Sequence, residues 1–502
     1  MKSQKLLFAR AYEKEAGEKI RSDARPQFHL SPYLGWMNDP NGFSYYQGKY
    51  HLFYQYNPYS TEWDSMHWGH AVSADLLHWD YLPAALAPDE PYDSFGCFSG
   101  SAVELPDGKQ LLLYTGVRKE GGEKAEEIQT QCAAVGDGLN YHKDSRNPII
   151  DETALPPGLS RNNFRDPKVW RGTDGSLRCV VGGCDENGLG RILLFSSPDG
   201  FSWAFESVLA ENDGRLGRMW ECPDFFELDG KHILLVSPQD MLPEGFEYHN
   251  GNGTVCMIGH YDEQRKKFLP DVDQAIDYGI DFYAPQTVLT PDGRRVMIGW
   301  MQNWDTSNLS KDEKRPWFGQ MSLPRELSVR SGRLFQQPIR ELERFRSGKV
   351  EYKDISLQGE MSLPGVEGRI VDLELTIRPE NSGALYRKFA LRFAQDGQHR
   401  TALSYRPHES VLKIDRKFSG SRRAYIHQRR CLVPYQNGEL KLRVILDRFS
   451  VEVFINDGEQ VMTATLKTDL AADAISFFAD GQVQMDVTKY DLFAEEQQDE
   501  TV

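Results

Sequence analysis

Between residues 30 and 335 the apolar positions come in short runs, and Gly, Asp and Pro stand between them. Typical runs are LLLYTGV, RILLFSS and HILLVSP, which are rich in residues that suit a pleated strand. Apolar residues at helical spacing are scarce over the same region. This pattern predicts a long succession of short β-strands separated by turns.

A motif recurs along this strand-rich region at a fixed interval. In SADLLHW, VGDGLNY and SPDGFSW an aspartate precedes an aromatic residue by four positions, and the aspartates are Asp75, Asp137 and Asp199. Each step is 62 residues, and a looser copy with Asp262 follows near the next step. A long period built from short strands is typical of a β-propeller with one four-stranded blade per repeat. The interval predicts five blades between residues 30 and 340.

Beyond about residue 342 the apolar positions alternate strictly with polar ones. Val371, Leu373, Leu375 and Ile377 show this alternation, and a second alternating run ends in the turn at residues 456–458. Strands with one apolar face build a β-sandwich. The exposed edges of such a sandwich can pair, so a homodimer is a further expectation.

The chain is therefore expected to be all-β, with a five-bladed β-propeller followed by a C-terminal β-sandwich. The expected divisions are a partly helical N-terminal extension (1–27), the propeller (28–340), a linker with a short helix (341–352), the sandwich (353–495) and an acidic tail (496–502).

Composition excludes several classes of partner. The formal net charge is −16 and there is no long basic stretch, so we expect no nucleic-acid partner. The first 25 residues contain neither a secretory apolar segment nor a membrane span. The seven cysteines are scattered and lack metal-ligand spacing, which indicates free thiols in a reducing compartment. We expect a cytoplasmic protein without a metal or cofactor.

Three acidic residues fall near one phase of the repeat. Counting back 33 to 41 residues from the repeat aspartates reaches Asp39, Asp166 and Glu221, in blades one, three and four. The corresponding stretches of the other blades are CFSGS and DFYAPQT, the latter with Asp281 and Tyr283. Because the innermost strands of a propeller converge on its axis, the three acids should face one another. Paired carboxyls beside aromatic residues are what glycoside cleavage requires.

Each acid also has a purely structural interpretation. Asn-Asp-Pro-Asn-Gly is turn chemistry, in which Asp39 caps its own backbone. Asp166 could form a local ion pair with Arg165, and Glu221 could bind a neighbouring backbone N–H. Three acids at a common phase, each beside an aromatic residue or an arginine, favour the catalytic interpretation.

The motifs WMNDPNG, FYQYNP, FSGS, FRDPKV and WECPD, in this order, closely resemble the signature blocks of the family 32 glycoside hydrolases, which include invertases and sucrose-6-phosphate hydrolases. The segment LDRFSVEVFINDG is similar to the family's sandwich block. The resemblance implies a nucleophile at Asp39, a transition-state stabiliser at Asp166 and an acid/base at Glu221. It further implies substrate contacts at Trp36, Asn38, Gln55, Trp63, Phe98, Ser99, Arg165 and Trp304.

The activity implied is retaining hydrolysis of terminal β-D-fructofuranosides, such as sucrose, sucrose 6-phosphate or short fructo-oligosaccharides, through a covalent fructosyl-enzyme. Asp39 must then be ionised, and we expect Asn38 and backbone N–H groups to keep its pKa low. Two alternatives stay open, namely an inverting five-bladed glycosidase that acts on arabinan or xylan and a non-catalytic sugar-binding protein. A phosphate on the substrate would need cationic groups at the rim of the site.

Overall fold

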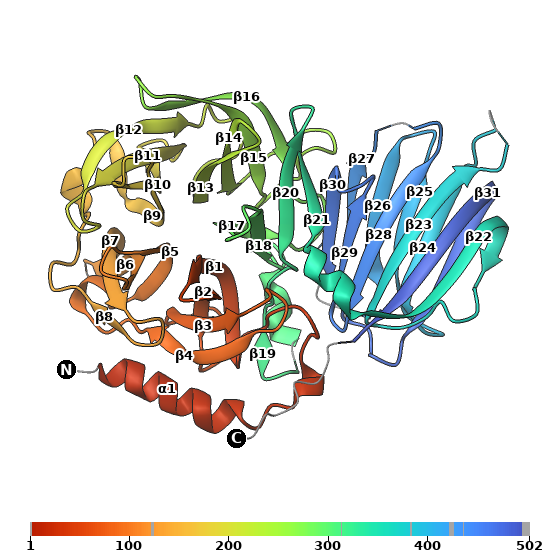
Figure 1. Cartoon of the computed structure of the whole chain (residues 1–502), viewed down its shortest axis with the longest axis horizontal. Helices are drawn as coiled ribbons and strands as arrows, with labels where there is room; N and C mark the ends of the chain where they lie inside the picture. Colours follow the sequence, from red (N-terminus) through yellow and green to blue (C-terminus); the bar gives the residue numbers. More distant parts are fainter. Residues whose placement is uncertain are drawn as a thin grey trace. The chain divides into compact units, whose positions relative to one another are not determined.

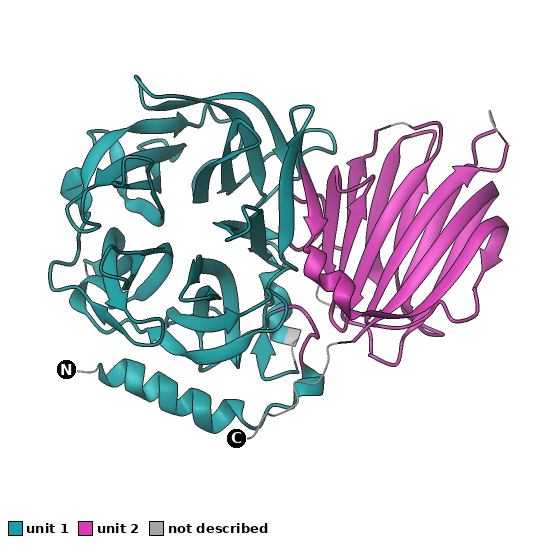
Figure 2. Ribbon diagram, in the orientation of Figure 1, with its two compact units in different colours: residues 1–24, 30–276, 282–334 teal, residues 25–29, 277–281, 335–502 magenta. Residues whose placement is uncertain are grey.

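The computed structural model describes residues 3–121, 125–312, 314–381, 384–420, 426–434 and 436–493. The chain forms two compact units (Figure 2). The N-terminal unit comprises residues 1–24, 30–276 and 282–334, and the C-terminal unit comprises residues 25–29, 277–281 and 335–502. The sequence predicts a single boundary between the two domains. In the structure, residues 25–29 and 277–281 also belong to the C-terminal unit.

The N-terminal unit is a five-bladed β-propeller (Figure 1). Blade one contains β1 (Gly35–Tyr46), β2 (Lys49–Asn57), β3 (His67–Ser73) and β4 (Asp80–Leu86). Blade two contains β5 (Gly96–Glu104), β6 (Gln110–Glu120), β7 (Glu126–Gly136) and β8 (Tyr141–Lys143). Blade three contains β9 (Leu159–Arg171), β10 (Leu177–Asp185), β11 (Gly190–Ser197) and β12 (Ala204–Glu211). Blade four contains β13 (Trp220–Leu228), β14 (Lys231–Pro238), β15 (Val255–Asp262) and β16 (Lys267–Ala275). Blade five contains β17 (Tyr283–Leu289), β18 (Arg295–Trp300), β20 (Arg325–Arg330) and β21 (Arg333–Pro338).

The apolar runs of the sequence are strands that are buried on both faces. In β6, Leu111 and Leu113 pack in a cluster with side chains of β9 and β10 in blade three. Leu112 and Tyr114, on the opposite face, pack with side chains of β2 and β3 in blade one. Because successive side chains of a strand point to opposite faces, a continuous apolar run joins one blade to both of its neighbours.

The 62-residue repeat corresponds to the outer hairpin of each blade. Each repeat aspartate lies in the turn between the third and fourth strands, where its Oδ1 accepts hydrogen bonds from two backbone N–H groups. The four aspartates are Asp75, Asp137, Asp199 and Asp262. This turn is local side-chain-to-backbone chemistry, and it explains why the repeat is visible in the sequence.

Blade five lacks this aspartate turn. Its outer hairpin joins β20 to β21 through Ser331 and Gly332, which have φ of 50° and 74°. A two-residue loop with both φ values positive matches the twist of a hairpin without a capping side chain. The same part of the chain adds β19 (Trp317–Phe318), which pairs in parallel with the start of β1 and so connects blade five to blade one.

An N-terminal helix, α1 (Gln4–Gly17), lies along the outer strand of blade one (Figure 1). Ser3 caps its first turn by accepting a hydrogen bond from the N–H of Leu6. Arg10 donates through Nε to the carbonyl of Ala84 in β4, and Glu13 accepts from the N–H of the same residue. No helix in the described part of the chain is long and apolar enough to cross a membrane.

The C-terminal unit is strand-rich, and its ten strands form one hydrogen-bonded sheet. One half contains β24 (Lys388–Gln395), β25 (Arg400–Arg406), β26 (Val411–Phe418) and β27 (Gln428–Leu432). The other half contains β23 (Val371–Pro379), β28 (Leu440–Asp447), β29 (Ser450–Ile455) and β30 (Gln460–Thr465). The long strands β22 (Arg346–Met361) and β31 (Ala474–Leu492) join the halves.

The two halves of this sheet face each other as the layers of a sandwich. The Sγ of Cys431 in β27 lies 3.9 Å from the Sδ of Met462 in β30, although these strands are at opposite ends of the strand order. The expected linker at 341–352 is not a separate segment. A 3₁₀ helix, η5 (Arg340–Phe345), leads directly into β22, which begins at Arg346 inside that range and pairs there with β31. The acidic tail (496–502) lies outside the described residues.

Candidate active site

The innermost strands of all five blades, β1, β5, β9, β13 and β17, carry a bulge at a similar depth. Each loses register with its neighbouring strand over one or two residues, which are 38–39, 99, 166–167, 222–223 and 284–285. In blades three to five the second bulged residue is proline, which has no N–H to leave unpaired. A bulge re-aims side chains, and here it does so around the propeller axis.

The bulges place the three acids in two different positions. Asp39 and Asp166 lie within their bulges, and Asp166 has a φ of 66°. Glu221 is the last paired residue before its bulge, as Arg165 and Tyr283 are in the neighbouring blades. The single repeat phase expected for all three acids is therefore wrong by about one residue for Glu221. Counting from the outer turns could not resolve this offset, because the connections between blades differ in length.

The inner strands surround a cavity of about 580 Å³, within the usual size of a small-molecule site. Ten of the eleven predicted site residues line it, namely Asn38, Asp39, Gln55, Trp63, Phe98, Ser99, Arg165, Asp166, Glu221 and Trp304. The lining residues that the sequence did not predict are Glu127, Gln129, Asn162, Asn163, Gln239, Asp240 and Asn252. Asn162 and Asn163 directly precede the FRDPKV motif, and this position is the feature of the sequence that could have predicted them as lining residues.

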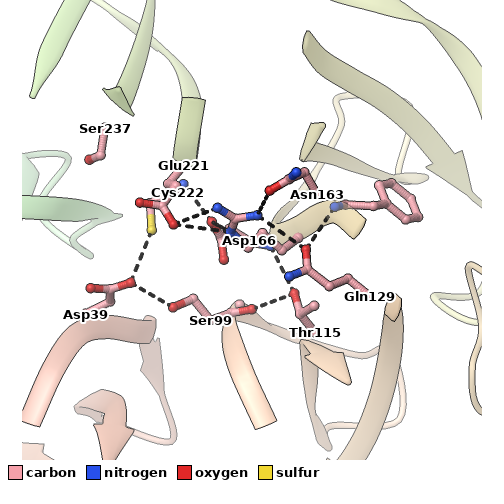
Figure 3. A network of polar contacts seen from close by, with 12 residues as sticks. Asp39, Ser99, Thr115, Gln129, Asn163, Asp166, Glu221, Cys222 and Ser237 are labelled. Atoms are coloured by element: carbon pink, nitrogen blue, oxygen red, sulfur yellow. Dashed lines mark hydrogen bonds and ion pairs between the residues drawn. The ribbon is translucent and has the colours of Figure 1, made fainter. Parts of the chain in front are cut away.

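Asp39 is held by one hydroxyl and one thiol (Figure 3). Its Oδ2 accepts a hydrogen bond from the Oγ of Ser99 at 3.1 Å and from the Sγ of Cys222 at 3.5 Å. Its Oδ1 is buried and has no hydrogen-bond partner among the described residues. Asp39 therefore keeps one oxygen uncommitted.

The environment of Asp39 raises its pKa to about 7. Burial is the main cause, and the negative charges of Glu221 and Asp166 add to it. The hydroxyl of Ser99 and the nearby polar side chain of Asn38 lower the pKa but do not prevail. The expected low pKa is therefore wrong, because the expectation counted nearby donors and omitted the desolvation of the carboxylate.

Arg165 connects the two other acids. Its guanidinium donates to Oε1 of Glu221 from Nη2 at 2.8 Å and from Nε at 3.2 Å, and Nε lies 3.8 Å from Oδ2 of Asp166. Asn163 and Gln129 accept from Nη1 at 2.8 and 3.3 Å, so the guanidinium is fixed from both sides. This arrangement gives the cavity a rigid, positively charged wall between two carboxyl groups.

Asp166 is held by backbone groups on both sides. Its own N–H donates to the Oγ1 of Thr115 at 2.9 Å, and its Oδ2 accepts from the N–H of Cys222 at 3.0 Å. Burial raises the pKa of Asp166 to about 6, against the lowering effect of Arg165 and with a further rise from Glu221. The N–H of Cys222 is available because this residue has a φ of 49° inside the bulge of β13.

Tyr283 is a further member of the site. Its hydroxyl donates to Oε2 of Glu221 at 2.6 Å and lies 3.1 Å from the carbonyl oxygen of Ser237. Both carboxyl oxygens of Glu221 therefore have donors, one from Arg165 and one from Tyr283. The sequence had placed Tyr283 in the correct blade without giving it a role.

The aromatic residues divide into a lining group and a supporting group. Trp63, which is 36% exposed, lies with its ring centroid 5.9 Å from that of Phe98 at the cavity. Trp36 was expected in the wall but is 2% exposed and does not line the cavity. Its indole Nε1 donates to Oδ1 of Asn38 at 2.7 Å, and its ring stacks on Trp304. Trp36 therefore supports two lining residues from behind.

Asp281, the other acid near the repeat phase, is not part of the cavity. It is fully buried in the C-terminal unit, where it pairs with Arg416 and accepts from the N–H of Thr465 at 2.7 Å. Among the described residues, no group of three or more His, Cys, Asp or Glu side chains is arranged to hold a metal ion.

Carboxyl groups that face one another across a single cavity are the arrangement by which glycoside hydrolases cleave their substrates. Residues 29–338 match the glycosyl hydrolases family 32 N-terminal domain, and residues 341–493 match the family 32 C-terminal domain. The chain belongs to glycosyl hydrolase family 32.

Relatives with known names support the same assignment. The chain is 38% identical to a sucrose-6-phosphate hydrolase of Escherichia coli over 90% of its own length and 91% of the relative's. It is 36% identical to a raffinose invertase of Escherichia coli, with coverage of 95% and 96%. Among solved structures, a Bombyx mori GH32 beta-fructofuranosidase has a TM-score of 0.82 at 35% identity, with 97% of both chains covered. A variant of that enzyme has been solved in complex with sucrose, and it matches with a TM-score of 0.83 at 34% identity, covering 98% of this chain and 99% of the other.

Proposed function

We propose that this chain hydrolyses terminal non-reducing β-D-fructofuranosides with retention of configuration, with Asp39 as the nucleophile and Glu221 as the acid/base. The observation that carries the proposal is the convergence of Asp39, Asp166 and Glu221 on one cavity, where Glu221 has donors at both carboxyl oxygens and Asp39 at one. Relatives named as a sucrose-6-phosphate hydrolase and a raffinose invertase support a fructosyl substrate.

The proposed reaction has two steps. The carboxylate of Asp39 attacks the anomeric C2 of the fructosyl unit while Glu221 gives a proton to the departing oxygen, which leaves a covalent fructosyl-enzyme. Glu221 then takes a proton from water, and the resulting attack on C2 releases fructose and restores Asp39. Asp166 and Arg165 bind the fructosyl hydroxyls, and the negative charge of Asp166 stabilises the positive charge that develops on the sugar ring.

Reaction in the presence of methanol tests the retaining mechanism. A covalent fructosyl-enzyme can pass its sugar to methanol, and retention predicts methyl β-D-fructofuranoside as the product, which NMR identifies without interference from mutarotation. An inverting enzyme would place methanol on the opposite face of C2, so methyl α-D-fructofuranoside as the product would select the inverting alternative. Release of arabinose from arabinosides or of xylose from xylosides, with no fructose released from sucrose, would likewise point to an inverting five-bladed glycosidase.

Two substitutions separate catalysis from binding. Asp39→Asn should abolish turnover and leave fructose binding largely intact, because it removes the nucleophile and preserves the shape. Ser44→Ala, in the same strand and away from the cavity lining, serves as the matched control and should keep wild-type activity. If the wild-type protein binds sucrose without hydrolysing it, the chain is a sugar-binding protein and the proposal is wrong.

We further propose a cytoplasmic location and a homodimeric state. All seven cysteines are free thiols, and six of them are buried, which suits a reducing compartment. In the C-terminal sheet the carbonyls of β30 already accept backbone hydrogen bonds from residues 278–281, whereas the edge strand β27 offers a pairing surface. Cell fractionation and light scattering test these two points.

A further inference from the structure

The C-terminal unit carries a cluster of cations on the outward face of β24, β25, β26 and β27. We call it the cationic face and define it by Lys388, Arg406, Lys413 and Arg430, one from each strand. These four side chains, together with Ser404, Glu409 and Val411, line a cavity of about 80 Å³. The cationic face therefore stands on a chain whose formal net charge is −16.

The strand register places these cations directly opposite one another. Lys388 lies opposite Arg406, since Phe389 pairs with Tyr405, and Lys413 pairs with Arg430. Ser404 pairs with Lys413 and so brings a hydroxyl between the two cationic pairs. Like charges directly opposite on neighbouring strands are unfavourable, so the fold tolerates two such pairs at a cost in stability.

Neighbouring carboxylates neutralise only half of this charge. Arg406 pairs with Glu409 at 3.1 Å, and Lys413 pairs with Asp415 at 2.9 Å. In the part of the chain that the structure describes, Lys388 and Arg430 form no ion pair, although the charge of Asp415 acts on Lys388, whose Nζ lies 5.9 Å from the ring centroid of Phe478. Partial burial lowers the pKa of Lys388, and the positive charges of Lys413 and Arg406 add to this effect.

Protection of a sheet edge does not explain the cluster. Charged side chains often keep edge strands from pairing with other chains, and β27 is an edge strand, so Arg430 fits that role. Lys388 and Arg406 lie on β24 and β25, which have neighbours on both sides. Their side chains therefore require another reason.

We propose that the cationic face binds a phosphate group, as inorganic phosphate or on a small phosphorylated metabolite. Arginine and lysine side chains with a nearby hydroxyl are the donors that recognise a tetrahedral oxyanion. A volume of about 80 Å³ corresponds to two or three water molecules, which suits one phosphate group, while the rest of a phosphorylated metabolite would lie outside the cavity. The site lies on the C-terminal unit and takes no part in the hydrolysis proposed above.

Phosphate titration of the full chain at low ionic strength, followed by calorimetry, tests this site. We expect one inorganic phosphate per chain, and we expect Lys388→Ser/Arg430→Ser to weaken binding by about tenfold or more, because both unpaired donors are lost. Lys441→Ser removes one cation from the other half of the sheet and should leave binding within about twofold of wild type. Both variants should keep wild-type fructosidase activity.

Further arms distinguish the source of the phosphate and control for folding. Equal binding of inorganic phosphate and glucose 6-phosphate would assign the site to the phosphate group alone, and tighter binding of glucose 6-phosphate would assign it to a sugar phosphate. If the double variant does not fold, Arg406→Ser/Lys413→Ser provides the same test from the other two strands. Absence of phosphate binding by the wild-type chain, unchanged binding by the double variant, or equal binding of glucose would each overturn the proposal.

Discussion

The hydroxyl of Ser99 donates a hydrogen bond to Oδ2 of Asp39 at 3.1 Å, and this contact joins the inner strands of blades two and one. It favours the ionised carboxylate in a cavity where burial and two neighbouring acids oppose ionisation. The hydrogen bond from Ser99 therefore supports ionisation of the proposed nucleophile.

Ser99→Ala should move the acid limb of the kcat/KM profile to higher pH. The limb of the wild-type enzyme should lie near pH 7, since the pKa of Asp39 is about 7 and only its ionised form attacks. Loss of the hydrogen bond raises that pKa further, by about one pH unit for a bond worth about 1.5 kcal/mol. Initial rates with sucrose between pH 4 and 9 measure the change.

Two other substitutions test the direction in which the acid limb moves. Ser99→Thr keeps the hydroxyl and should keep the wild-type limb. Asp166→Asn removes a negative charge that raises the pKa of Asp39, so its residual activity should show a limb at lower pH. An acid limb that does not move in either Ser99→Ala or Asp166→Asn would show that Asp39 does not control it.

Tyr283→Phe should slow the reaction most for substrates with a poor leaving group. The Tyr283 hydroxyl lies 2.6 Å from Oε2 of Glu221 and orients the proposed proton donor. Misplacing a general acid costs about 10² to 10⁴-fold when the leaving oxygen needs a proton. Sucrose turnover should fall by at least about tenfold on this basis, whereas nitrophenyl β-fructofuranoside, whose leaving group departs unprotonated, should lose much less. Equal losses for both substrates would assign Tyr283 a purely structural role.

The rim of the cavity should favour an uncharged leaving group. Among the described lining residues, Arg165 is the sole cation, and it already donates to Glu221, Asn163 and Gln129. The other charged residues that the sequence did not predict are Glu127 and Asp240, which would repel a phosphate.

We therefore expect kcat/KM for sucrose to exceed that for sucrose 6-phosphate by about tenfold or more, which corresponds to about 1.4 kcal/mol of discrimination. Asp240→Asn and Glu127→Gln should each raise kcat/KM for sucrose 6-phosphate and have little effect on kcat/KM for sucrose. The ratio of the two values should therefore fall. Parallel kinetics with both substrates at two salt concentrations provide the measurement. A preference for sucrose 6-phosphate in the wild-type enzyme would contradict this account of the rim.

The sequence predicts those parts of the fold that depend on local chemistry. The turn around Asp199 uses only side-chain-to-backbone bonds within a few residues, so it appears as a readable motif. The turn at Ser331 and Gly332 uses backbone conformation alone, and the fifth repeat is therefore invisible in the sequence. The first residues of β22 fall in the expected linker, because the partner that makes them a strand, β31, lies more than 100 residues away.

The sequence predicts those site residues whose position in the repeat and whose chemistry both indicate a role in catalysis. Asp39, Asp166 and Glu221 follow from the repeat and from the resemblance, but the bulge that offsets Glu221 depends on pairing with β14. Asn252 and Gln239 reach the cavity from connections whose course the tertiary structure sets, and an amide side chain has no distinguishing sequence pattern. The pKa of Asp39 likewise depends on charges from blades three and four.

His29 should make the stability of the C-terminal unit depend on pH above neutrality. It is buried between Asp447 and Glu452, with Nδ1 2.8 Å from Asp447 Oδ2 and Nε2 3.0 Å from Glu452 Oε1. Burial alone would lower its pKa, but the hydrogen bonds and charges of the two acids outweigh burial and raise the pKa to about 9. The pKa of Asp447 is lowered to about 2 despite burial, which agrees with a charged partner.

A raised pKa means that the folded state binds this proton more tightly than the unfolded state does. The stabilisation, about 3 kcal/mol, is therefore complete below about pH 6.5 and is lost as the pH rises through about 9. We expect Tm to fall between pH 6.5 and 9.5 in the wild-type chain and to change much less in His29→Gln, which cannot gain the charge. His399→Gln, at an exposed histidine 3.5 Å from Asp396, is the matched control and should follow the wild-type profile. If His29→Gln shows the same decline as the wild type, the imidazolium does not stabilise this unit, because the pH dependence would then belong to other groups.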